Sequence, residues 1–293
     1  MTRRFLAWTL LGAALTGAGC NSDSRQLFDR AQAQWREGNY EVAIQLDRML
    51  YEKDPQGKLA PQALLNIGNI SYMNLRKIKD AVDAYTRLVE EFPGRPEELK
   101  ARLQLADIYE NEIVDLTQAV AEYDRILGFA GLDSRLEIEF RRANAYFKME
   151  DYNRALRELR RIEEAGVSGH LADQVLLKIG NIYQIQQKYE DAASYLERVE
   201  QSPCTECRRS AIVSLAATYE ALYDIPHAIE TIRKLDHTPE NDRQVSQEVA
   251  RLTGKQRKLV STPMTWRWAP LESSKAPQSR RTNSKSAKGS HPK

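Results

Sequence analysis

The chain has 293 residues, of which 29% are charged, and its mean hydropathy is −0.59. A chain of this length and polarity is long for one compact core, which favours an extended array in which each part packs on its neighbours. The formal net charge is only +2, and we expect no nucleic-acid partner.

Residues 1–19 are expected to be an export signal. Arg3 and Arg4 form a basic start, residues 5–15 are apolar, and small residues at 17–19 precede Cys20. An apolar core of this length is too short to cross a membrane as a helix.

A cysteine directly after Gly19 resembles the lipoprotein box of bacteria. The resemblance implies that Cys20 is lipidated and begins the mature protein, with residues 20–23 as the lipidated start. Gly17 departs from that motif, which usually has Leu there, and an ordinary secretory signal with an incidental cysteine is the alternative. Asn21 is not the Asp that retains lipoproteins at the inner membrane. The resemblance therefore implies the periplasmic face of the outer membrane in a Gram-negative bacterium.

The body of the chain is a repeat array. Residues 64–72 recur with few changes at 176–184, and the alignment extends to six copies at intervals of 36–38 residues. Each copy has a small residue in its first predicted helix and an alanine in its second. The small residues are Ala31, Gly68, Ala106, Ala143, Gly180 and Ala216, and the alanines are Ala43, Ala81, Ala119, Ala155, Ala192 and Ala228.

This pattern resembles the tetratricopeptide repeat, a helix-turn-helix unit. The resemblance covers residues 24–238 and implies an all-α fold, a right-handed α-solenoid of about six repeats. An apolar pattern at Val245, Val249, Leu252 and Leu259 predicts a C-terminal capping helix over residues 239–260. Residues 261–293 are rich in Ser, Pro, Lys and Arg, and we expect a basic disordered tail.

The charge is unevenly distributed. Residues 241–293 contain 12 Lys and Arg against 3 Asp and Glu, whereas residues 20–240 carry a net charge of −9. The predicted repeats are therefore acidic and the C-terminal end is basic.

Cys204 and Cys207 are the only paired cysteines, and they stand where the first helix of the sixth repeat should begin. We predict a local disulfide, with a pair of free thiols or a redox role as alternatives. Zinc would need two further ligands, and His170, His227 and His237 are scattered in the sequence. We therefore expect no metal site.

Motifs for catalysis are missing. The sequence has no phosphate-binding glycine-rich loop, no His-Glu-x-x-His and no Gly-x-Ser-x-Gly. We expect no enzymatic activity and no cofactor.

A peptide-binding groove is the predicted functional site. In tetratricopeptide repeats the first helix of each pair faces the concave side, and positions five, nine and twelve share one stripe. Position five is apolar, position nine carries mostly carboxamides that can bond a peptide backbone, and position twelve adds aromatic rings. The predicted groove residues are Phe28, Gln32, Trp35, Leu65, Asn69, Tyr72, Leu103, Asp107, Phe140, Asn144, Phe147, Leu177 and Asn181. The alternative is that these residues pack between repeats.

A lipidated cysteine followed by helical repeats resembles the BamD-like outer-membrane assembly lipoproteins. The resemblance implies a non-catalytic, lipid-anchored periplasmic scaffold whose partners are envelope proteins or extended peptide segments. Six repeats and a basic tail depart from that family. The alternative is an envelope-organising factor that contacts peptidoglycan or anionic lipid through its basic tail.

Overall fold

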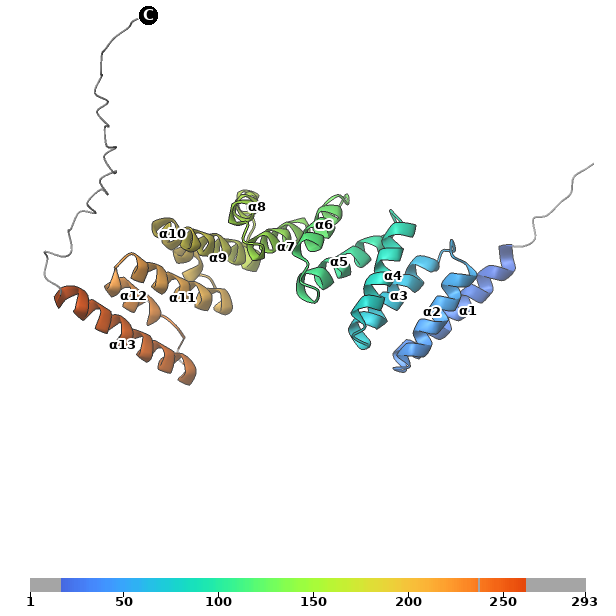
Figure 1. The fold of residues 1–293 in the computed structure, drawn as a ribbon, viewed down its shortest axis with the longest axis horizontal. Helices are drawn as coiled ribbons and strands as arrows, with labels where there is room; N and C mark the ends of the chain where they lie inside the picture. The colour runs from blue at the N-terminus through green and yellow to red at the C-terminus, as the bar shows by residue number, and fades with distance from the viewer. Residues whose placement is uncertain (1–16, 237, 262–293) are drawn as a thin grey trace, which may run out of the picture. The chain divides into compact units, whose positions relative to one another are not determined.

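A computed structural model describes residues 17–236 and 238–261, and every regular element in these ranges is helical (Figure 1). The short π-helix η1 continues α3. The elements are α1 (Gly17–Arg36), α2 (Tyr40–Lys53), α3 (Ala60–Asn69), η1 (Ile70–Asn74), α4 (Ile78–Glu91), α5 (Pro96–Asn111), α6 (Leu116–Leu127), α7 (Arg135–Lys148), α8 (Tyr152–Glu164), α9 (Gly169–Ile185), α10 (Tyr189–Glu200), α11 (Thr205–Ala221), α12 (Ile225–Ile232) and α13 (Pro239–Ser261).

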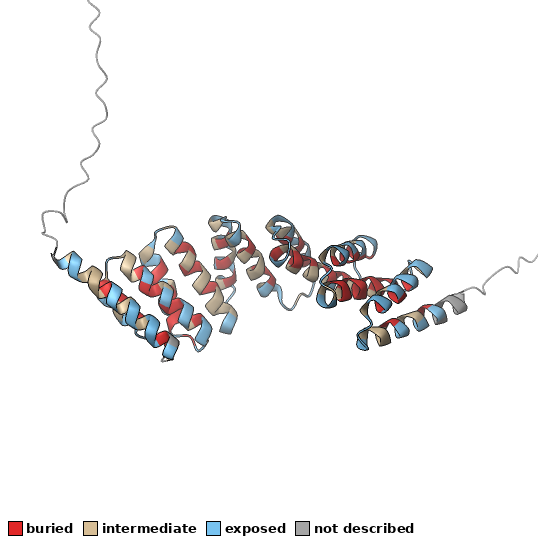
Figure 2. Ribbon diagram, turned by 60° about the horizontal axis from the view of Figure 1, so that its bottom comes forward, coloured by how far each residue is buried: buried red, intermediate tan, exposed pale blue. Residues whose placement is uncertain are grey.

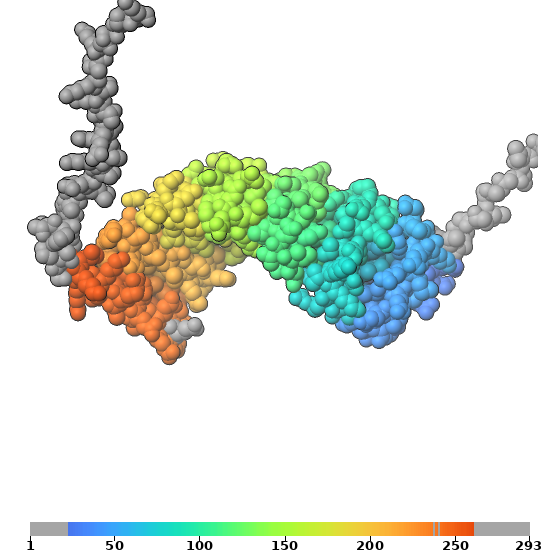
Figure 3. Space-filling model, in the orientation of Figure 1, coloured from blue at the N-terminus to red at the C-terminus, as the bar shows by residue number. Residues whose placement is uncertain are grey.

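These helices form six consecutive pairs within the described residues, and α13 follows the last pair. In the first five pairs the two helices pack on each other, and each second helix also contacts the next first helix as far as α9. The space-filling view shows these repeats following one another in chain order (Figure 3). The predicted all-α solenoid is confirmed.

The chain divides into two compact units, residues 1–211 and 212–293, and α11 runs across the boundary. Unit 1 contains the first five helix pairs. Unit 2 contains the rest of α11 with α12 and α13.

The small residues that set the repeat period are buried. Buried positions follow one side of each helix, as Figure 2 shows. The six alanines of the second helices are all 0% exposed, and the small residues of the first helices are buried as well. A Cβ added at Gly180 would lie 2.8 Å from the side chain of Leu196 in the next helix. Small residues therefore allow the two helices of a pair to approach closely.

A residue with positive φ stands two positions before each second helix. The φ angles are 83° at Gly38, 55° at Arg76, 60° at Val114, 61° at Glu150, 59° at Gln187 and 61° at Tyr223. The same left-handed conformation in all six turns shows that the connector geometry repeats as the helices do. Only the first turn uses glycine, the residue that adopts this conformation without steric cost.

Unit 2 has its own core. Ile212 and Ala216 of α11 and Ile232 of α12 are buried together with Leu235, and Val245 and Val249 of α13 pack against them. A second cluster joins Ile225 and Ala228 to Leu252, with Leu259 beside it. All four apolar residues expected for the final helix thus pack in the core that α13 shares with α11 and α12.

The predicted signal at 1–19 and the tail at 261–293 lie almost entirely outside the described residues. α1 already begins at Gly17, so the backbone of Cys20 is helical in the uncleaved chain. None of the helices in the described ranges combines the length and the apolar character that a membrane crossing requires.

Candidate binding surface

The thirteen predicted groove residues all lie in unit 1, on α1, α3, η1, α5, α7 and α9. We call them the first-helix row. Leu65 is buried, at 3% exposure, and the other twelve are half-buried. The row is therefore partly open to solvent and partly used for packing.

Several polar members of the row join neighbouring repeats. Trp35 donates from Nε1 to Oδ1 of Asn74 over 3.1 Å. The Tyr72 hydroxyl donates to Oδ2 of Asp107 over 3.1 Å, and Arg141 donates to Oδ1 of the same carboxylate over 3.0 Å. Burial and the nearby Asp107 raise the pKa of Tyr72 to about 12. These bonds fix the first helices relative to one another.

Glu110 is the centre of a further network that the sequence did not reveal. It is buried and accepts hydrogen bonds from the Tyr123 hydroxyl at 2.5 Å, from Lys148 at 2.8 Å and from Asn144 at 3.4 Å. Burial alone would raise the pKa of Glu110, but the bonds from Lys148 and Tyr123 outweigh it and lower the pKa. The one available signal was its place three residues after Asp107 on the same helix face.

The polar side chains predicted at position nine are therefore partly hydrogen-bonded within the chain. Asp107 and Asn144 belong to these networks, and Asn69 accepts a bond from the Tyr85 hydroxyl at 2.8 Å. Asp107 and Asn144 support interfaces between repeats, whereas Asn69 joins the two helices of the second repeat.

The row differs at α7 and α9. Phe140, Phe147 and Leu177 are half-buried there, and Nζ of Lys178 lies 4.4 Å from the centroid of the Phe147 ring. Oδ1 of Asn181 is buried and has no hydrogen-bond partner. Burial lowers the pKa of Lys178. We call these five residues the α7–α9 patch.

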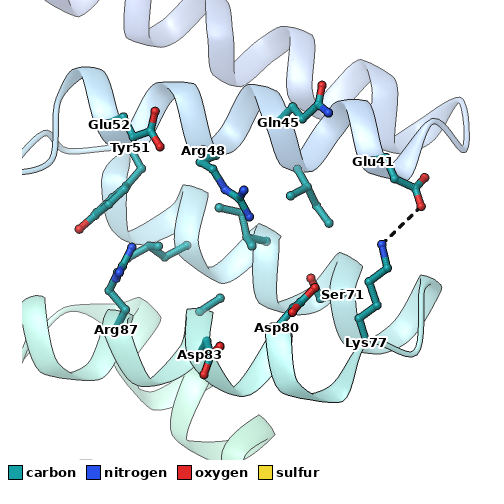
Figure 4. A pocket seen from close by; sticks show the side chains of 14 residues that line it. Glu41, Gln45, Arg48, Tyr51, Glu52, Ser71, Lys77, Asp80, Asp83 and Arg87 are labelled. Carbon is teal, nitrogen blue, oxygen red and sulfur yellow. Dashed lines mark ion pairs between the residues drawn. The ribbon is translucent and has the colours of Figure 1, made fainter.

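A cavity of about 350 Å³ lies on the second helices of the first two repeats (Figure 4). Its walls come from α2 and α4, and apolar side chains such as Leu64 and Ile67 of α3 contribute to its floor. The rim is charged, and Glu41 and Lys77 form an ion pair across it at 3.7 Å. The sequence did not predict this cavity, because alternating charges on a helix ordinarily mark a solvated face. The lining residues labelled in Figure 4 are Glu41, Gln45, Arg48, Tyr51, Glu52, Ser71, Lys77, Asp80, Asp83 and Arg87.

Cys204 and Cys207 are free thiols in the structure, so the predicted disulfide is not formed there. Burial, together with Cys204, raises the pKa of Cys207 to about 12, which is the opposite of an activated nucleophile. The histidines are scattered in the sequence, but the fold brings His170 to the cysteine pair, with its Nδ1 3.3 Å from Sγ of Cys204. His170 lies in the first turn of α9 and Cys204 directly precedes α11, so the two helix starts bring together residues 34 positions apart in sequence.

Comparison with known proteins supports the repeat assignment. Residues 70–134 and 140–203 match the family model described as tetratricopeptide repeat. A search of curated protein sequences gave no significant match. These two segments, which together make up less than half of the chain, are therefore similar to tetratricopeptide repeats.

Solved structures show the same fold. The C-terminal part of a repeat-containing protein from Cytophaga hutchinsonii aligns with a TM-score of 0.59 at 14% identity, over 82% of this chain and 93% of that one. A tetratricopeptide repeat protein from Parabacteroides merdae aligns with a TM-score of 0.55 at 15% identity, over 80% and 89%. PilW, described as a widely conserved type IV pilus biogenesis factor, aligns with a TM-score of 0.50 at 14% identity, over 76% and 98%. At these sequence identities the similarity shows a shared fold and nothing more.

Proposed function

We propose that this protein is a non-catalytic, lipid-anchored scaffold on the periplasmic face of the outer membrane of a Gram-negative bacterium. It binds an extended segment of another envelope protein during outer-membrane assembly. The tetratricopeptide fold supports the scaffold role, and Cys20 after a signal-like segment supports the anchor. The similarity in fold to PilW, a pilus biogenesis factor, supports an envelope process.

The α7–α9 patch is the observation that carries the binding role. Its three apolar side chains are partly open, so a bound side chain would remove further apolar surface from water at about 25 cal/mol per Å². The Asn181 side chain is half-buried, and its carboxamide can both donate to and accept from a peptide backbone. Lys178 makes no ion pair among the described residues and can donate to a carbonyl or carboxylate. Together these groups suit an extended backbone with apolar side chains.

Photocrosslinking in cells tests this site. A photoreactive phenylalanine analogue at Leu177 should crosslink to a partner protein, and the same analogue at Val42 should not. Val42 is the matched control because it is apolar, 45% exposed, and lies on α2 of the same unit. Equal crosslinking at both positions would contradict the proposal.

The anchor is tested separately. Cys20→Ala should move the protein from the outer-membrane fraction to the soluble periplasm, and radiolabelled palmitate should enter only the wild type. Wild-type protein without label would reject lipidation while leaving the scaffold role intact.

The charge distribution favours a second candidate, contact with peptidoglycan or anionic lipid through the basic end. This candidate rests on residues 241–293, which contain 12 basic and 3 acidic residues. Deletion of residues 261–293 separates the two, because partner crosslinking at Leu177 should survive it and binding to anionic vesicles should not.

A further inference from the structure

Three side chains that can bind a metal meet where α9 and α11 begin, within unit 1. Nδ1 of His170 lies 3.3 Å from Sγ of Cys204 and 3.4 Å from Sγ of Cys207. All three ligand atoms lie within 4.8 Å of one another. An imidazole and two sulfurs at such distances form one face of a coordination polyhedron.

The distances fit a zinc ion. Zn–S bonds of about 2.3 Å and Zn–N bonds of about 2.0 Å place neighbouring N and S ligands of a tetrahedron roughly 3.5 Å apart. The two observed N···S distances, 3.3 and 3.4 Å, are close to that edge. Small side-chain movements would open the centre of the face to an ion.

The surrounding backbone holds the two cysteines in place. The backbone N–H of Cys207 donates to Sγ of Cys204 over 3.2 Å, and the N–H of Cys204 donates to Oγ of Ser202 over 3.0 Å. Ser202 in turn donates to Asp173 of α9. Arg208 donates to the carbonyl of Ser202 over 3.2 Å. Such contacts around ligands orient them and raise metal affinity.

Exposure provides an entry path. Cys207 is buried, Cys204 is half-buried and His170 is exposed. An ion can therefore enter from the His170 side and keep its fourth position for water or another ligand.

We propose that His170, Cys204 and Cys207 bind one Zn²⁺ ion through Nδ1 and the two sulfurs, with water in the fourth position. Both thiols release a proton to solvent as the two Zn–S bonds form, and no oxidation or reduction is involved. The ion joins α9 to the start of α11, and so fixes the fifth repeat to the first turn of the sixth. A disulfide between Cys204 and Cys207 and the zinc site exclude each other, so the site requires reduced thiols.

The test is a titration of the full chain, reduced and carrying Cys20→Ser in every variant, with Zn²⁺ against a chromogenic chelator. The control His227→Ala removes an exposed histidine whose Nδ1 is hydrogen-bonded to Asp224 and whose ring packs beside that of Tyr219. We expect one equivalent of Zn²⁺ in the parent and in His227→Ala, at least a tenfold loss of affinity in His170→Ala, and no stoichiometric binding in Cys204→Ser. Co²⁺ should produce thiolate-to-metal charge-transfer absorption in the parent, and added Zn²⁺ should abolish it.

His170→Ala changes an exposed side chain and is expected to keep the helical circular-dichroism spectrum of the parent, so its result does not depend on folding of the cysteine variant. No stoichiometric binding in the reduced parent would overturn the proposal. Parent-like affinity in His170→Ala would also overturn it, because a thiol pair alone would then account for the binding.

Discussion

Gly68 of α3 lies directly against the ring of Tyr85 of α4. A Cβ added to Gly68 would lie 2.4 Å from Cε1 of that ring. Tyr85 is fully buried and its hydroxyl donates to Asn69, so both packing and a hydrogen bond fix the position of the ring. The closeness of these two helices therefore depends on the missing side chain.

Gly68→Ala should destabilise unit 1 by about 1–3 kcal/mol, because the added methyl group must displace a buried ring. Urea denaturation followed by circular dichroism measures the change. Gly254→Ala is the matched control, since nothing lies within 4 Å of a Cβ added at this position in α13. It should instead stabilise by about 0.5–1 kcal/mol through helix propensity. Destabilisation of equal size in both variants would contradict the explanation.

The close packing of the two helices in each repeat was predictable, because the small residues that allow it recur at a regular spacing in the sequence. Ala81 and Ala192 recur at nearly constant spacing, and all six such alanines are buried. The helix pairs follow from that period together with the apolar pattern. The turn conformation was less visible, because residues as different as Arg76 and Val114 adopt the same positive φ.

The candidate sites were predictable only in part. The first-helix row follows from helical spacing, but its internal partners do not, since Asp107 meets Arg141 across 34 residues. The meeting of His170 with Cys204 depends on how two successive first helices pack. No local pattern encodes that distance, whereas the Cys-x-x-Cys spacing is local and was recognised.

Val114 is strained by its turn. It has φ of 60° and is 66% exposed, so a β-branched side chain occupies a left-handed conformation with little packing in return. Val114→Gly should stabilise by about 1 kcal/mol by relieving this conformation. Thermal melting measures it. Val42→Gly, at an exposed valine inside α2, should instead destabilise, by roughly 0.3–0.5 kcal/mol. A loss of stability in Val114→Gly would show that the turn is not strained.

Asp47 gives unit 1 a pH dependence. Its side chain in α2 is fully buried, and neither carboxylate oxygen has a hydrogen-bond partner. Burial raises its pKa from 3.8 to about 7, although the nearby Asn66 acts in the opposite direction. The folded state therefore holds this proton more tightly than the unfolded state. The resulting stability is complete below about pH 4 and is lost as the pH rises through 7.

Asp47→Asn should remove this pH-dependent loss of stability. Between pH 4 and 8 the free energy of unfolding of the variant should rise relative to that of the wild type, by on the order of 4 kcal/mol at most, since each pKa unit corresponds to about 1.4 kcal/mol. Urea midpoints across that range provide the measurement. Asp29→Asn, whose side chain is 59% exposed, is the control and should run parallel to the wild type. Parallel curves for Asp47→Asn as well would show that Asp47 does not titrate in this range.

Glu220 fastens α13 to α11 in unit 2. It accepts bonds from Nη1 of Arg251 at 2.9 Å and from Lys255 at 2.8 Å. The bond from Arg251 is the main cause that lowers the pKa of Glu220 from 4.5 to about 2. Because the folded-state pKa is lowered, the stabilisation is present above about pH 4.5 and is lost as the pH falls towards 2.

Glu220→Gln should loosen α13 at neutral pH, because the amide cannot pair with two cations. We expect a loss of at most about 3 kcal/mol in unit 2, and faster hydrogen exchange at the backbone amide of Leu252. Glu248→Gln removes only the contact that Arg251 makes within α13, and it should change exchange at Leu252 much less. If both variants exchanged at the wild-type rate, the apolar contacts of Val245, Val249 and Leu252 would suffice to hold the helix, and Glu220 would have no role in fastening it.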